Sequence, residues 1–138
     1  MSKGTKNKIL ESATQLIQTR GFNNTSLQDI LTQSDVSKGN FFYYFKSKED
    51  LGFTVLDKLS KEFLEKLSCE VFTPDLKPIE QIYKMLDMEI ALFQKQGPNS
   101  GCPFGNLAAE LSDFHEEFRI RIAKVFAIWA EMIKMVLD

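Results

Sequence analysis

Five consecutive aromatic residues, from Phe41 to Phe45, constrain the fold of this chain more than any other feature of its sequence. A buried strand of such composition needs partner strands, and no other segment of the sequence has the pattern of one. The run therefore predicts a short helix, in which Phe41 and Phe45 lie four residues apart and pack on one face. The opposite face is then polar and open to a partner. A helix that is buried on all sides is the alternative.

Apolar residues recur at helical spacing through the rest of the chain, which predicts an all-α fold. Gly21 suits the end of the first helix, and Thr25 and Ser26 are N-cap residues for the second. Ser37 caps the aromatic helix after a turn of about four residues, so the N-terminal part is predicted to contain a helix-turn-helix. The predicted helices span about residues 5–20, 27–32, 38–45, 48–72, 78–96, 104–111 and 114–136.

The charge of the chain is divided unevenly along its 138 residues. Residues 1–50 carry seven basic and five acidic side chains, a balance of +2, whereas residues 51–138 carry ten and fourteen, a balance of −4. An acidic body orients a mildly basic head toward DNA. We therefore expect a helix-turn-helix head over residues 1–48 and a helical body over residues 49–138.

Other features of the sequence exclude several classes of protein. No apolar run approaches the roughly 18 residues of a membrane span, and the polar start lacks the core of a signal peptide. Cys69 and Cys102 lack metal-ligand spacing and are too few for a disulfide framework. These features predict a cytoplasmic protein without a membrane partner, a metal or a cofactor. A single histidine and the lack of any nucleophile or phosphate-binding motif also argue against an enzyme.

Three stretches of the head together resemble the DNA-binding domain of the TetR family of bacterial repressors. They are the cap segment TSLQDI at residues 25–30, the turn at residues 34–36 and the run SKGNFFYYFKSKEDL at residues 37–51. The resemblance covers about residues 5–51 in the right order. The chain departs from the residues that are usual in the family at Ser34, Asp35, Phe41, Phe42 and Tyr44.

The resemblance implies a homodimer that binds a near-palindromic operator in double-stranded DNA and leaves it when a small-molecule inducer binds the body. The residues that it places at base edges are Lys38, Gly39 and Asn40. Those that it places at phosphates are Thr25, Ser26, Ser37, Tyr43, Tyr44 and Lys48, with Lys46 as a further candidate. Serine and threonine at helix starts suit anion binding, and lysine adds attraction without sequence preference.

The seventh predicted helix is still apolar where the sequence stops at Asp138. Members of the TetR family usually continue for two more helices, which build much of the dimer interface. We therefore expect a body that is truncated at its C-terminus, with an amphipathic final helix at a natural terminus as the alternative.

The loop that begins at Gly97 and the segment after it resemble a branch of the same family that includes repressors of N-ethylmaleimide reductase. In that branch a cysteine after Ser-Gly responds to electrophiles or oxidants. The resemblance makes Cys102 a candidate sensor thiol, just before the predicted sixth helix, whose N-terminus favours a thiolate. A small buried apolar residue is the alternative, and Cys69 is expected to pack inside.

An inducer cavity in the body is expected to be mainly apolar, with a few polar groups that orient the ligand. The candidate residues around it, besides Cys102, are Phe93, Phe104, Asn106, Glu110, Phe114, Phe118 and Trp129. The sequence thus predicts a DNA-binding transcriptional regulator, a repressor released by a small-molecule, electrophile or oxidant inducer. A helical protein-interaction module without DNA binding is the alternative.

Overall fold

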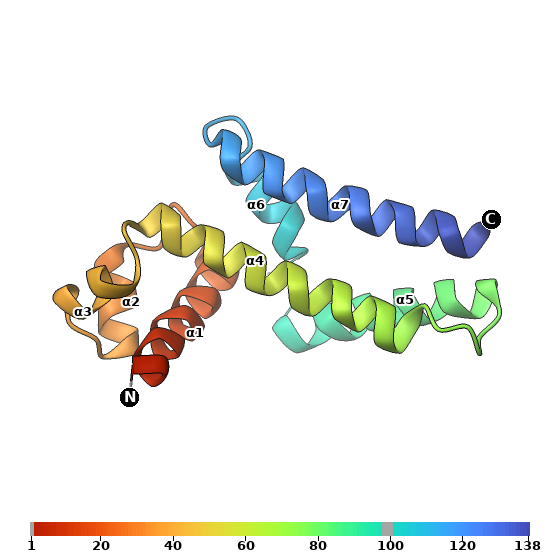
Figure 1. The fold of residues 1–138 in the computed structure, drawn as a ribbon, viewed down its shortest axis with the longest axis horizontal. Helices are drawn as coiled ribbons and strands as arrows, with labels where there is room; N and C mark the ends of the chain where they lie inside the picture. Colours follow the sequence, from red (N-terminus) through yellow and green to blue (C-terminus); the bar gives the residue numbers. More distant parts are fainter. Residues whose placement is uncertain (1, 98–100) are drawn as a thin grey trace.

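The computed structural model describes residues 2–97 and 101–138 of the chain. Every regular element in these two ranges is a helix, which confirms the predicted all-α class (Figure 1). The helices are α1 (Ser2–Arg20), α2 (Leu27–Ser34), α3 (Lys38–Tyr44), α4 (Lys48–Lys66), the π-helical turn η1 (Leu67–Val71), α5 (Pro78–Gln96), α6 (Pro103–Leu111) and α7 (Glu116–Leu137). None of the described helices is long and apolar enough to cross a membrane.

The first three helices form a helix-turn-helix head, as predicted, and short polar side chains set their boundaries. Ser26 caps α2: its hydroxyl accepts the N–H of Asp29 at 3.0 Å, and the Asp29 carboxylate accepts the N–H of Ser26 at 2.9 Å. The Ser37 hydroxyl likewise accepts the N–H of Asn40 at 3.2 Å at the start of α3. These bonds satisfy amide groups that have no partner within their helix.

The aromatic run divides between the interior and the surface of the head. Phe41 and Phe45 are 0% and 3% exposed, whereas Tyr43 is 79% exposed and Phe42 is also on the surface. Phe45 follows directly after α3, in an extended conformation, and still packs with Phe41. The run therefore anchors α3 from one side, and the alternative of a helix buried on all sides is wrong.

Helix α4 joins the head to the body (Figure 1). Leu51, Val55 and Leu56 on its first half lie in one core with buried residues of α1, α3, α6 and α7. Gly52 lies where the rings of Phe22 and Phe118 approach this helix, because a Cβ atom there would be 2.7 Å from an atom of each ring. A larger residue at this position would force the head and the body apart.

The end of α4 differs from the predicted continuous helix. The helix continues as the wider π-helical turn η1. Leu67 and Val71 of this turn are buried in a second hydrophobic cluster with Met85 of α5. Cys69 lies between them in sequence and is exposed. Its predicted packing role is therefore wrong, because η1 buries only Leu67 and Val71 and leaves the three residues between them on the surface.

Helix α5 exposes the more regular of its two apolar faces. Its inward face, against α7 and η1, includes the buried residues Gln81 and Met85 and the partly buried Glu89 and Leu92. A regular row of large apolar residues on the rest of the helix is exposed among the described residues: Ile79, Tyr83, Leu86 and Ile90, with Phe93 at its end only 38% exposed.

Candidate DNA-binding face and ligand cavity

The outer face of the helix-turn-helix carries most of the predicted DNA contacts. Lys38, Gly39, Asn40 and Tyr43 are exposed on α3. Ser26, Ser37 and Lys46 are exposed beside it, at the ends of α2 and α3, and Tyr44 is partly exposed. A Cβ atom at Gly39 would meet no other atom within 4 Å, so the packing of the head does not require glycine there.

The Ser26 and Ser37 hydroxyls keep a proton to donate. Each oxygen accepts a backbone N–H from its own helix. A hydroxyl both accepts and donates, so either group is able to donate to a phosphate oxygen while it caps its helix. These two serines fit the predicted contact type, which stays a prediction.

Two other predicted phosphate contacts lie in different surroundings. Thr25 is 0% exposed and its hydroxyl donates to the Gly21 carbonyl oxygen at 2.7 Å, so the prediction of a phosphate contact from its side chain is wrong. The Lys48 ammonium lies 4.3 Å from the centroid of the Phe22 ring, and burial lowers the pKa of Lys48. Lys48 therefore supports the junction between head and body.

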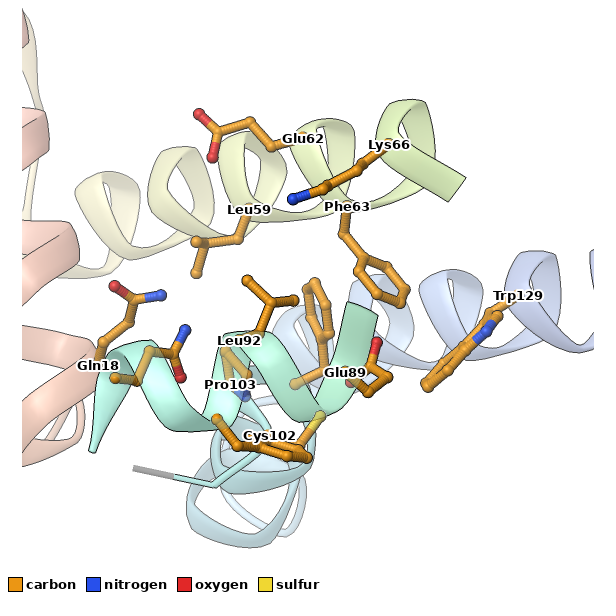
Figure 2. Close-up of a pocket in the computed structure, with 13 residues that line it drawn as sticks. Gln18, Leu59, Glu62, Phe63, Lys66, Glu89, Leu92, Cys102, Pro103 and Trp129 are labelled. Carbon is orange, nitrogen blue, oxygen red and sulfur yellow. The ribbon is translucent and has the colours of Figure 1, made fainter. Parts of the chain in front are cut away.

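A cavity of about 250 Å³ lies between α4, α5, α6 and α7 in the body, with Gln18 of α1 at one end (Figure 2). Four of the predicted residues line it: Phe93, Cys102, Phe104 and Trp129. The other lining residues were not predicted from the sequence; they are Gln18, Leu59, Glu62, Phe63, Lys66, Glu89, Leu92, Gln96 and Pro103.

Aromatic side chains form much of the cavity wall. The Phe63 ring centroid lies 5.0 Å from that of Trp129 and 5.4 Å from that of Phe104. The Trp129 indole N–H donates to the Met85 sulfur at 3.3 Å, which holds the ring in place. Such a wall suits a flat or branched apolar molecule.

Glu89 is an acidic group in this apolar wall. Its Oε1 atom is buried and has no hydrogen-bond partner among the residues that the structure describes. Burial raises the pKa of the Glu89 carboxyl. A sequence signal for this residue does exist, because Glu89 is four residues after Met85 and three before Leu92, at inward-facing helical spacing.

Four predicted cavity residues lie outside this cavity. Phe114 is 81% exposed, in the connection between α6 and α7. Phe118 is buried in the junction core, with its ring 5.2 Å from that of Phe22. Asn106 and Glu110 line a smaller hollow beside Gly21, which adjoins the cavity because Gln18, Leu59 and Pro103 line both. The predictions for Phe114 and Phe118 are therefore wrong, whereas a ligand role of Asn106 and Glu110 beside the cavity stays a prediction.

Glu110 connects α6 to the turn between α1 and α2. Its carboxylate accepts the N–H of Phe22 at 2.9 Å and the N–H of Asn23 at 2.5 Å. Gly21 precedes these amides with φ of 84°, and a Cβ atom there would be 2.9 Å from Glu110 Oε2. We name this pair of hydrogen bonds the Glu110 latch.

Cys102 is the N-cap residue of α6 and is partly buried in the cavity wall. Its side chain makes no capping hydrogen bond. Lys66 lines the same cavity from α4 (Figure 2). The position of Cys102 in the cavity wall is compatible with the predicted sensor role, which stays a prediction.

Comparisons with known families match both parts of the chain. The family of bacterial regulatory proteins, tetR family, matches residues 9–53, and the tetracyclin repressor-like C-terminal domain matches residues 78–138.

Individual relatives are transcriptional regulators. The chain is 35% identical over 125 residues to an HTH-type regulator in the lacX 3′ region of Lactococcus lactis subsp. lactis, covering 91% of this chain and 64% of that protein. It is 31% identical over 134 residues to the HTH-type transcriptional regulator LmrA of Bacillus subtilis, covering 96% and 71%. The crystal structure of reduced NemR from Escherichia coli superimposes with a TM-score of 0.86 at 27% identity, covering 96% of this chain and 69% of that one.

Proposed function

The chain belongs to the TetR family of bacterial regulatory proteins, and from that membership we propose that it is a transcriptional repressor. It binds operator DNA through α3 and leaves the operator when a small molecule occupies the cavity of the body. The observation that carries this proposal is α3 itself, which the buried Phe41 anchors while Tyr43 and its polar neighbours stay exposed. A family of transcriptional regulators also agrees with the expectation that the chain is not an enzyme.

The exposed residues of the head divide by chemistry into two kinds of contact. Lys38 and Asn40 are able to hydrogen-bond base edges in the major groove, and Gly39 allows close approach of the backbone. Hydroxyl and ammonium groups bind phosphate oxygens without sequence preference. The residues proposed for phosphate are Ser26, Ser37, Tyr43, Tyr44 and Lys46, with Lys48 as a long-range charge.

A homodimer completes the proposal. Two copies of α3 in successive major grooves read a near-palindromic operator when their separation matches about one turn of DNA. The chain spans 64% of the length of its Lactococcus relative, so dimerisation is a proposal for the whole protein. We likewise propose a DNA-binding unit over residues 1–48, a regulatory unit over residues 49–138 and a cytoplasmic location for the whole protein.

Fluorescence anisotropy on two duplexes, the region upstream of the gene and a random sequence, tests DNA binding. We expect Tyr43→Ala to weaken binding to both duplexes about tenfold, as the loss of a bond to a charged acceptor predicts. We expect Lys38→Ala to reduce the preference for the upstream duplex. The matched controls are Tyr83→Ala on α5 and Lys124→Ala on α7, which are exposed outside the head.

Unchanged affinity and preference in both head variants would contradict the DNA-binding proposal. No binding of the wild type to either duplex at low salt would favour the interaction module instead. The sensor role of Cys102 is tested separately by treating operator complexes with N-ethylmaleimide. Equal release from wild type and Cys102→Ser would remove that role.

A further inference from the structure

The position of Glu89 gives the cavity a chemical preference. Glu89 is on the inward face of α5, and its carboxylate lies among Phe63, Trp129 and Cys102 (Figure 2). The buried Oε1 atom has no hydrogen-bond partner in the part of the chain that the structure describes. Nothing in the packing of the cavity wall therefore uses this atom.

We propose that the cavity binds an amphipathic cation, with an apolar or aromatic body against Phe63, Phe104 and Trp129 and a primary ammonium or amidinium group on the Glu89 carboxylate. This inference rests on the proposed function, because it assigns a ligand class to the proposed inducer site. It is carried by the juxtaposition of an unsatisfied carboxylate oxygen and an aromatic wall.

Burial makes a carboxylate selective for positive charge. An ionised carboxylate in apolar surroundings loses hydration, and a bound ammonium group replaces it with a charge-assisted hydrogen bond. A neutral ligand of the same shape leaves the carboxylate unpaired, and an anionic one adds repulsion. The raised pKa of Glu89 is the signature of this lost hydration. Aromatic faces add attraction for a cation that passes over them.

The other charges of the cavity do not reverse this preference. Glu62 and Lys66 of α4 are the other formally charged residues in its lining, and both are exposed. Figure 2 shows the Glu62 carboxylate directed away from the cavity. Exposed charges of opposite sign are screened by water and salt, whereas a buried atom interacts through a medium of lower dielectric constant. Binding of an anionic ligand by Lys66 would contradict the proposal, so the experiment includes an anionic probe.

Trp129 makes the binding measurable without DNA. It is the only tryptophan of the chain and lies in the cavity wall, so a ligand in the cavity changes its fluorescence. The probes share one apolar body and differ in charge: 4-tert-butylbenzylamine as the cation, 4-tert-butylbenzyl alcohol as the neutral form and 4-tert-butylbenzoate as the anion. Titrations are made at about pH 7.5, where the amine is protonated. The variants are Glu89→Gln and, as the matched control, Glu131→Gln, which changes an exposed residue of α7 outside the cavity lining.

We expect the wild type and Glu131→Gln to bind the amine at least about tenfold more tightly than the alcohol, as an ion pair in a partly buried site predicts. Glu89→Gln is expected to lose this preference. Equal binding of amine and alcohol by the wild type, tighter binding of the benzoate, or no binding of the amine would each overturn the proposal. So would a preference that survives in Glu89→Gln.

The comparison of the three probes on the wild type does not depend on the folding of any variant. It is also independent of the proposed function. If the protein prefers the amine but binds no DNA, the proposed repressor function is wrong and the assigned ligand class stands. If the protein binds DNA but shows no preference among the probes, the assigned ligand class is wrong and the proposed function stands.

Discussion

The Glu110 latch is expected to contribute measurably to stability, although it consists of only two hydrogen bonds. A hydrogen bond to a charged acceptor contributes about 1.5–3 kcal/mol in favourable settings. The bond to the Phe22 amide is partly buried, whereas the bond to the Asn23 amide is exposed and contributes less. We therefore expect Glu110→Ala to lower the free energy of unfolding by about 2 kcal/mol, or the melting temperature by about 8 °C for a chain of this size.

Gly21 allows the latch to be tested as a coupled pair. Gly21→Ala places an alanine at a φ of 84°, which costs about 1–2 kcal/mol, and its Cβ displaces the Glu110 carboxylate from 2.9 Å. In a Glu110→Ala background only the backbone strain remains. The double variant is therefore expected to be about 1–2 kcal/mol more stable than the sum of the two single effects predicts.

Urea unfolding followed by circular dichroism, with wild type, both single variants and the double variant, measures this coupling. Glu131→Ala on α7, an exposed position, is the control and is expected to change stability by less than about 0.5 kcal/mol. Additivity of the two substitutions within about 0.3 kcal/mol would refute the latch. A loss from Glu110→Ala no larger than that of the control would refute it as well.

Three further predictions concern other parts of the molecule. Gly52→Ala is expected to destabilise the chain by about 1–2 kcal/mol in urea, because overpacking against Phe22 and Phe118 exceeds the gain in helix propensity. Ser26→Ala is expected to cost about 1 kcal/mol through loss of the α2 cap, and unchanged thermal stability would contradict the capping box. Folding raises the pKa of the Glu89 carboxyl, so its ionisation destabilises the folded wild type as the pH rises. Glu89→Gln should therefore be more stable than the wild type at neutral pH. This advantage should disappear below the unfolded pKa of about 4.3, where Glu89 is protonated in both states.

The helix starts could be predicted from the sequence because capping is local. The Ser26, Ser37 and Ser47 hydroxyls each accept the amide of a residue three positions later, so the whole interaction lies within four residues. Glu110 and its partner Phe22 are 88 residues apart, and no local pattern connects them. The hydrogen bonds from Glu110 to the head could therefore not be predicted from the sequence.

The faces of the body helices were harder to predict than the helices themselves. A periodic apolar row identifies a helix, but burial of that row depends on which neighbours cover it. Phe114 and the row that includes Tyr83 on α5 are apolar and yet exposed among the described residues. Glu89 is charged and yet turned inward. The stronger apolar periodicity favoured burial of Phe114 and of this row, and it outweighed the weaker spacing signal that relates Glu89 to Met85 and Leu92.

The length of α4 converts small rotations into large displacements. Its 19 residues span about 28 Å at a rise of about 1.5 Å per residue, from the junction at Phe22 to the cavity residue Lys66 (Figure 1). A tilt of about 5° at the cavity end moves the other end by about 2.5 Å over that span. A hydrogen bond tolerates a change of only about 0.5 Å between donor and acceptor. A rotation too small to disturb the packing of the body is therefore large enough to break the contacts of α3 with a phosphate backbone.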